Sequence, residues 1–192
     1  MNKVKLCQAQ PDDDFYTAAV IEFSLSSTPN IAVANPNRMI ESSLNEYLRL
    51  INEATEDGAD IVVFPEGSLN YNGIGSRTNL IKFAVELNGS DLYNSTSFDN
   101  TCDYSKQSSI ITKISFNARK NKIYVLINVI ERSNCGGTGT HELCALYSSN
   151  LVFDRNGCIV SRYRKFSTKY DPMLNSTSIP EVQIFHTGSA SG

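Results

Sequence analysis

An amphipathic helix pattern that leads into a short, continuously apolar strand pattern occurs twice in this sequence of 192 residues. In the first unit, apolar residues recur every three or four positions over 39–54, and the apolar run 60–64 follows after Gly58. In the second unit the helical pattern covers 105–122 and the apolar run covers 123–130. Strands that are apolar on both faces are typical of parallel sheets covered by helices. The two units therefore predict an α/β fold.

Three further segments have strand patterns. An apolar, β-compatible run covers 15–24. Two more runs, 143–153 and 158–166, are joined through Asn156-Gly157, a pair that favours a tight hairpin turn, so we expect an antiparallel hairpin here. A last short strand is expected over 182–186.

The organisation predicted for the chain is a single domain. Residues 70–102 are rich in Asn, Ser, Asp and Gly apart from an apolar patch at 80–87, which indicates a long surface excursion. No linker or internal repeat is visible. We therefore expect one domain over 15–192, preceded by a segment, 1–14, that lies outside it.

Charge and hydropathy argue against a nucleic-acid partner and against a transmembrane segment. With 17 Lys and Arg against 20 Asp and Glu, the net charge is -3, so there is no basic field to attract a phosphate backbone. No apolar stretch approaches the roughly 18 residues that a membrane-spanning helix needs. The segment 1–14 has no apolar core and is not a signal peptide as written. We expect no nucleic-acid partner and no transmembrane segment.

The cysteines and histidines do not form a metal-binding pattern. The five cysteines contain no CxxC pair, and His141 and His186 are the only histidines, so we expect no metal. Cys135 and Cys144 bracket a glycine-rich loop that a disulfide could close in an oxidising compartment. The alternative is a pair of loop thiols in a cytosolic protein.

Three N-glycosylation sequons bear on the same question of compartment. They begin at Asn88, Asn94 and Asn175, and the first two lie in the polar excursion, where an acceptor would be exposed. Sequons also arise by chance. They favour the secretory route, whereas the N-terminus as written argues against it.

Two segments carry side chains that could take part in chemistry. Glu66 follows the first buried strand and Pro65, at the carboxyl end of the strand, where open α/β sheets bind their ligands. On the second arm of the hairpin, strand alternation puts Arg162 and Arg164 on one face and Tyr163 and Lys165 on the other. Each segment also has a plain structural interpretation: a solvated carboxylate at a strand exit, and an exposed edge strand protected by lysine.

Together these segments resemble a known family. DGADIVVFPE at 57–66 and VFDRNGCIVSRYRK at 152–165 resemble the glutamate and lysine motifs of the carbon-nitrogen hydrolase (nitrilase) superfamily, in the same order and with similar spacing. The segments 16–23 and 123–129 and the loop between Cys135 and Cys144 are similar to the biotinidase and vanin (pantetheinase) branch, including its insect vanin-like members. The resemblance extends from about residue 15 to about residue 185.

The resemblance implies a fold and a reaction. The fold would be the N-terminal portion of an α-β-β-α sandwich. The reaction would be hydrolysis of a small-molecule amide, pantetheine-like or biotinyl, by a Glu, Lys and Cys triad without a cofactor. By motif, Glu66 would be the general base and Lys165 would stabilise the oxyanion. Separately, the sequons and the loop between Cys135 and Cys144 lead us to expect that the parent protein is extracellular.

The chain departs from the family pattern at the nucleophile. In the family a cysteine follows the lysine motif, but none of the residues after Lys165 is cysteine. Cys158 lies an odd number of positions before Lys165, so the predicted strand would point the two side chains to opposite faces. Cys7 and Cys102 are each expected to be a disulfide half or a surface thiol. We therefore expect no nucleophile in the chain and a partial domain with little or no amidase activity.

Three readings of the function remain open at this stage. The chain is part of an amidase whose complete form carries the cysteine; or it is a non-catalytic, truncated pseudoenzyme that acts as a binding or regulatory protein; or it is a non-functional fragment.

Overall fold

A mixed β-sheet runs through the centre of the molecule. The computed structural model describes residues 3–8, 16–23, 36–69, 74, 76–87, 102–133, 144–168 and 171–185. The strands are β1 (Lys3–Gln8), β2 (Thr17–Glu22), β3 (Ile61–Val63), β4 (Val85–Glu86), β5 (Tyr124–Ser133), β6 (Ala145–Phe153) and β7 (Ile159–Arg164). Their order across the sheet is β1-β2-β3-β5-β6-β7, and β4 pairs separately with β5.

The centre of the sheet is parallel and its two sides are antiparallel. β2, β3 and β5 pair in parallel, as expected for strands separated by helices. β1 pairs antiparallel with β2 at one edge, whereas β6 and β7 continue antiparallel from β5 at the other. This arrangement places the carboxyl end of β3 close to the middle of β5 and β6.

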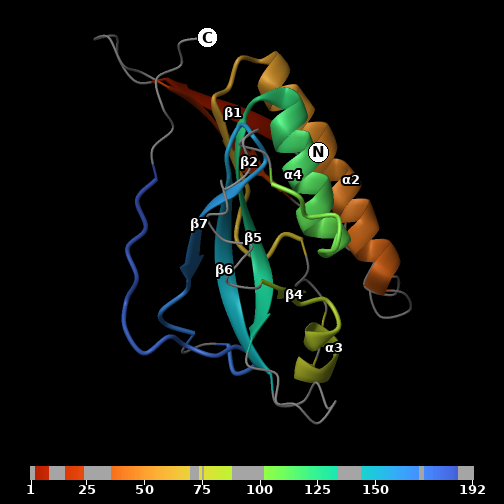
Figure 1. Ribbon diagram of the computed structural model, residues 1–192, viewed down its shortest axis with the longest axis vertical. Coiled ribbons are helices and arrows are strands. Elements are labelled where there is room, and N and C mark those ends of the chain that lie inside the picture. Colours follow the sequence, from red (N-terminus) through yellow and green to blue (C-terminus); the bar gives the residue numbers. More distant parts are fainter. Residues whose placement is uncertain are drawn as a thin grey trace.

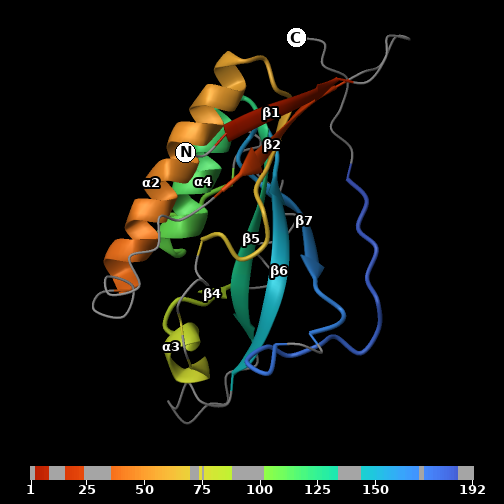
Figure 2. The ribbon, with the colours of Figure 1, turned by 180° about the vertical axis from the view of Figure 1, so that it is seen from behind.

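Two helices cover one face of the sheet. α2 (Pro36–Glu56) and α4 (Ser109–Asn121) lie side by side on that face, as both views show (Figure 1, Figure 2). Their buried residues and the inward residues of the strands form the main core, which includes Leu44, Ile51 and Ile114. The short helix α3 (Arg77–Ile81) packs with Ile130 and Leu146 in a second cluster. No helix in the described ranges is long and apolar enough to cross a membrane.

The opposite face carries a smaller apolar cluster. Ile61, Tyr124 and Val152 are buried there, and Phe185 stacks on Tyr124 with ring centroids 6.2 Å apart. Phe185 belongs to the extended segment 171–185, which runs beside β7 (Figure 1). This segment is attached to the edge strand where the backbone N–H of Arg164 donates to Glu181 at 3.1 Å.

Most of the predicted elements are confirmed. The helices over 39–54 and 105–122, the strands beside them, the strand over 15–24 and the hairpin are all present. The strand expected over 182–186 is wrong: residues 182–185 form no strand, and His186 lies outside the described residues.

The physical reason is exposure. Val182 and Ile184 are 84% and 80% exposed, so their apolar alternation has no packing partner within the described residues. The segment 1–14, expected outside the domain, contains β1, which pairs with β2 over its whole length.

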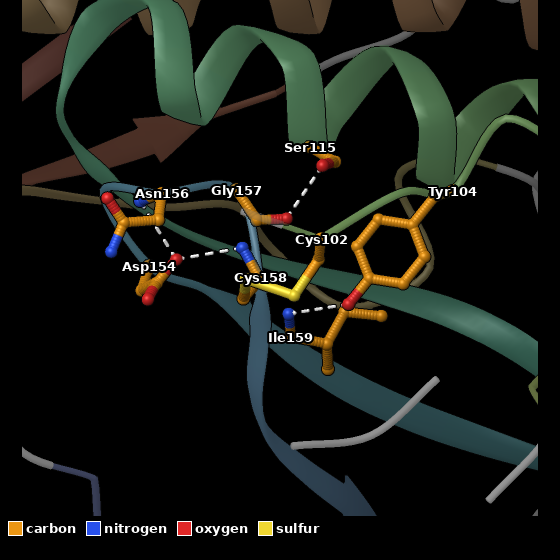
Figure 3. Close-up of a disulfide and its surroundings, with 8 residues drawn as sticks. All are labelled: Cys102, Tyr104, Ser115, Asp154, Asn156, Gly157, Cys158 and Ile159. Atoms are coloured by element: carbon orange, nitrogen blue, oxygen red, sulfur yellow. Dashed lines mark hydrogen bonds between the residues drawn. A yellow bond between two sulfur atoms is a disulfide. The ribbon is translucent and has the colours of Figure 1, made fainter. Parts of the chain in front are cut away.

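The hairpin turn is tied to α4 and to the loop before it (Figure 3). Cys102 and Cys158 form a disulfide, which the sequence did not predict as a pair. The cysteines are 56 positions apart in the sequence, so this cross-link stabilises the fold by roughly 4 kcal/mol through the lost entropy of the unfolded chain. Next to it, the hydroxyl of Tyr104 accepts the N–H of Ile159 at 2.9 Å, and the hydroxyl of Ser115 donates to the carbonyl of Gly157 at 2.6 Å.

Gly157 and Gly58 offer a matched pair for testing how closely the turn is packed. Both have a φ of +80°, but a Cβ on Gly157 would lie 2.4 Å from the carbonyl oxygen of Ser115, whereas a Cβ on Gly58 would meet nothing within 4 Å. We expect Gly58→Ala to lower the free energy of unfolding by about 1–2 kcal/mol through backbone strain alone. Gly157→Ala should cost a further ~1–3 kcal/mol through overlap. Urea unfolding of both variants measures the difference; equal losses would contradict the tight contact.

Candidate active site

Glu66 lies in a tight turn at the carboxyl end of β3. Pro65 has no N–H to continue the strand, and the hydroxyl of Ser68 donates to the carbonyl of Pro65 at 2.7 Å, which closes the turn. Gly67 takes a positive φ of 73°, a conformation that suits glycine. The sequence Pro-Glu-Gly-Ser therefore directs the glutamate out of the end of the strand.

The turn is anchored to the helix layer by aromatic packing. Phe64, only 2% exposed, stacks on Tyr47 of α2 with ring centroids 3.8 Å apart. The hydroxyl of Tyr47 is hydrogen-bonded to the hydroxyl of Ser68. Burial raises the pKa of Tyr47, so the phenol stays neutral and serves as a structural contact.

Lys165 follows the last residue of β7 and reaches Glu66 across the sheet. Its backbone N–H donates to the carbonyl of Ser148 at 2.8 Å, which extends the β6–β7 ladder by one position. Its Nζ lies 2.8 Å from Oε1 and 2.9 Å from Oε2 of Glu66. The structure thus brings together the two predicted site residues, which are 99 positions apart.

Two buried polar residues of the neighbouring strands support this pair. The Oγ of Ser148 donates to Oε1 of Glu66 at 2.9 Å. Asn128 on β5 donates from Nδ2 to Oγ of Ser148 at 3.0 Å, and its Oδ1 accepts the backbone N–H of Gly67 at 3.0 Å. Neither residue was expected from the sequence, although a polar Asn inside the apolar run 123–130 is a signal that indicates one of them.

The Glu66 carboxylate is held in its charged form. Burial by itself raises the pKa of Glu66, but the hydrogen bonds from Lys165 and Ser148 and the charge of Lys165 outweigh it and lower the pKa below the usual value for glutamate. The two side chains are 52% and 45% exposed, so the ion pair is accessible from solvent. The arrangement offers a carboxylate that can accept a proton beside a cation that can stabilise a developing negative charge.

The other cations of the motif face the opposite side of the sheet, as strand alternation predicted. Arg164 and Arg162 both contact Glu131, whose side chain is fully buried, at 2.5 and 3.3 Å. Ser149 donates to the same carboxylate at 2.7 Å, and the guanidinium of Arg164 lies 4.3 Å from the ring centroid of Tyr147. This buried group holds β7 on β6 and does not contact Glu66.

Every cysteine whose side chain the structure describes is disulfide-bonded. Cys102 and Cys158 are bonded to each other, and Cys144 is also disulfide-bonded. Cys135, its expected partner, lies outside the described residues, so the Cys135–Cys144 pairing stays a prediction. The side chain of Cys7 is likewise not described.

Among the sequons, only Asn175 falls in the described part of the chain. It is exposed, and its Oδ1 accepts hydrogen bonds from the N–H of Leu146 at 2.9 Å and from Arg77 at 3.0 Å. Asn88 and Asn94 lie outside the described residues.

Neither a metal cluster of described residues nor the cavity on the helix side includes Glu66. In the described ranges, no three His, Cys, Asp or Glu residues gather to hold a metal. A cavity of about 340 Å³ lies on the helix side, lined by Leu44, Phe83 and Lys113 among others, and neither Glu66 nor Lys165 lines it.

Comparison with known proteins identifies relatives over almost the whole chain. Residues 30–180 match the model of the family described as Carbon-nitrogen hydrolase. Vanin-like protein 2 of Drosophila melanogaster is 33% identical over 180 residues, 91% of this chain and 30% of its own length. Biotinidase of Takifugu rubripes is 24% identical over 91% of this chain and 36% of its own length. Pantetheine hydrolase VNN2 of Homo sapiens is 25% identical over 90% of this chain and 33% of its own length.

The fold is also found among solved structures. The crystal structure of Saccharomyces cerevisiae Nit3, of the nitrilase superfamily, superposes with a TM-score of 0.54 and 16% identity over 73% of this chain and 44% of that protein. The α/β architecture described here is therefore the N-terminal portion of the nitrilase-type sandwich. The chain spans about a third of the length of the curated relatives that it matches.

The ion pair predicts a pH-dependent effect of Lys165. We expect Lys165→Met to raise the pKa of Glu66, because the ammonium that favours the carboxylate is removed, while Lys165→Arg should keep it low. Since the pKa of Glu66 is depressed in the folded state, the pair stabilises the fold above the pKa of unfolded glutamate, and this contribution is lost as the pH falls through the folded-state value. The difference in unfolding free energy between wild type and Lys165→Met should shrink from pH 7 to pH 3.

Carboxyl ¹³C titration and urea unfolding make these two measurements. Lys120→Met, an exposed lysine of α4, serves as the control. A Glu66 pKa that is equal in wild type and Lys165→Met would show that the contact is not electrostatic.

Proposed function

The chain belongs to the carbon-nitrogen hydrolase family, and on this premise we propose that it carries the base and the oxyanion-stabilising lysine of an amidase of the pantetheinase and biotinidase type. The observation that carries the proposal is the contact of Glu66 with Lys165 at 2.8 and 2.9 Å, made by two residues that are 99 positions apart in the chain.

The two residues suit the two demands of amide hydrolysis by a thiol. Glu66 takes the proton of the thiol as the S–C bond forms, and it gives the proton to the nitrogen as the C–N bond breaks and the amine leaves. Lys165 stabilises the negative oxygen of the tetrahedral intermediate. Water then attacks the thioester carbonyl; Glu66 takes one water proton and returns it to the sulfur as the acid is released. Nothing in these steps requires a cofactor.

The thiol of this reaction comes, in our proposal, from outside the 192 residues. Cys102, Cys144 and Cys158 are all disulfide-bonded, and no cysteine follows Lys165. The curated relatives are about three times longer than the part that they share with this chain. We infer that the 192 residues on their own have little or no amidase activity.

The names of the relatives support a proposal for the substrate class. Proteins named pantetheine hydrolase and biotinidase are similar to this chain over nine-tenths of its length. We propose a small linear amide, pantetheine-like or biotinyl, as the substrate. A binding or regulatory role without turnover is the alternative outcome of the test below.

The activity test compares the 192 residues with a longer form that includes the downstream cysteine. We expect the longer form to hydrolyse pantetheine or a biotinyl amide and the 192 residues to be inactive. In the longer form, Glu66→Gln should lower kcat by about 10²-fold or more, because the base for proton transfer is lost. Lys165→Met should lower kcat by about 10²–10³-fold, because an oxyanion contact is lost.

Glu86→Gln is the matched control for these variants. Glu86 is also a 52%-exposed glutamate in an ion pair, with Arg132 at 3.1 Å, and it lies on β4, which β5 and β6 separate from β7. Its substitution should leave kcat unchanged. Ligand binding without turnover by the longer form would favour the non-catalytic alternative, and full activity of Glu66→Gln would rule out the proposed base.

We also propose that the protein follows the secretory route and is a glycoprotein. Disulfides persist in oxidising compartments, and all three cysteines whose side chains the structure describes are disulfide-bonded. Asn175 supports the proposal further, because this sequon residue is exposed.

Secretion is tested by expressing the full-length gene in an animal cell. We expect the product in the medium, with no free thiol on Cys102 or Cys158, and a mass that falls on treatment with peptide N-glycosidase. Asn175→Gln should remove part of that mass difference. A product that stays in the cytosol with both thiols reactive would overturn the proposal.

A further inference from the structure

Ser148 connects both members of the ion pair. Its carbonyl accepts the backbone N–H of Lys165 at 2.8 Å, and its hydroxyl donates to Oε1 of Glu66 at 2.9 Å. The residue is 2% exposed, so water does not compete freely for these contacts. One residue of β6 thus contacts the lysine through its backbone and the glutamate through its side chain.

The direction of the Ser148 hydroxyl is set by Asn128. A hydroxyl has one proton, and the Oγ of Ser148 already accepts the Nδ2–H of Asn128 at 3.0 Å, which leaves its proton for Glu66. Asn128 is itself oriented: its Oδ1 accepts the N–H of Gly67, and its Nδ2 also donates to Asn150 at 2.9 Å. The reversed amide would place Nδ2–H against the Gly67 N–H, so the observed orientation is favoured.

These contacts make the two oxygens of Glu66 unequal. From the described residues, Oε1 accepts two hydrogen bonds, from Ser148 at 2.9 Å and from Lys165 at 2.8 Å, whereas Oε2 accepts one, from Lys165 at 2.9 Å. A carboxylate oxygen has about two lone-pair sites. Oε1 is therefore filled, and Oε2 keeps a site for an incoming proton.

We infer that Ser148, oriented by Asn128, is a positioning residue that engages Oε1 of Glu66 and leaves Oε2 as the oxygen that accepts the proton of the thiol. This inference rests on the proposed function for the identity of the proton donor. The contacts themselves lie in the described residues and can be tested without turnover.

The first test is the pKa of Glu66 in the 192-residue protein, measured by ¹³C titration of labelled glutamate and assigned with Glu66→Gln. Ser148→Ala should raise this pKa, because a hydrogen bond to the charged form is lost. Ser148→Thr should restore the wild-type value, because it keeps the hydroxyl. The matched control is Ser161→Ala, which removes a serine that is 3% exposed on the next strand and has no contact with Glu66. A rise in Ser148→Ala that Ser148→Thr reverses supports the inference, and an unchanged pKa in Ser148→Ala overturns it.

The second test uses the pH profile of the longer form. Ser148→Ala should move the acidic limb of the kcat/KM profile to higher pH, because the Glu66 carboxyl is harder to ionise. The variant should also lower kcat by roughly tenfold or more, because the carboxylate is no longer held in position to take the thiol proton. A merely structural loss would lower the rate without moving the limb, and that result would overturn the inference. Absence of amidase activity in the longer form would instead contradict the proposed function, while the titration of Glu66 would still decide whether Ser148 orients the carboxylate.

Discussion

The antiparallel register of β6 between β5 and β7 is the constraint on which the site depends. It places Asn128 opposite Asn150 and aligns the end of β7 so that Lys165 pairs with Ser148. A slip of one residue would turn every side chain of β7 to the other face, and Lys165 would then point away from Glu66. Three features stabilise this register: the Gly157 turn, the Cys102–Cys158 bridge and the buried group around Glu131.

The sheet holds two carboxylates with opposite environments on its two faces. Glu131 has no exposed surface and is held by two arginines and a serine, so the pairing offsets the cost of removing a charge from water. Glu66 has one lysine and remains half exposed. A fully enclosed carboxylate cannot exchange protons with a substrate, whereas an accessible one can. This division suits the roles that we propose, in which Glu131 stabilises the fold and Glu66 exchanges protons with the substrate.

The sequence predicted most of the fold because the helices and central strands have strong periodicity. The strand predicted over 182–186 is absent from 182–185, since apolar alternation does not supply a neighbouring strand. The resemblance singled out Glu66 and Lys165, but their contact follows from the register and could be established only in three dimensions.

The buried polar residues were harder to find. Asn128 interrupts an apolar strand and therefore needed hydrogen-bond partners, but its sequence neighbours do not identify them. The pairing of Cys102 with Cys158 could not be deduced, because five cysteines allow several connectivities and Cys102 reaches the hairpin only through the tertiary fold.

The Cys102–Cys158 bridge also changes the covalent topology of the chain. It closes a ring that contains α4, β5 and β6, the elements that connect the loop before α4 to the hairpin turn. A protease that cuts the backbone once between the two cysteines therefore leaves a single covalent molecule, in which the part that carries Glu66 stays joined to the part that carries Lys165. The two halves of the ion pair would separate only after the disulfide is reduced.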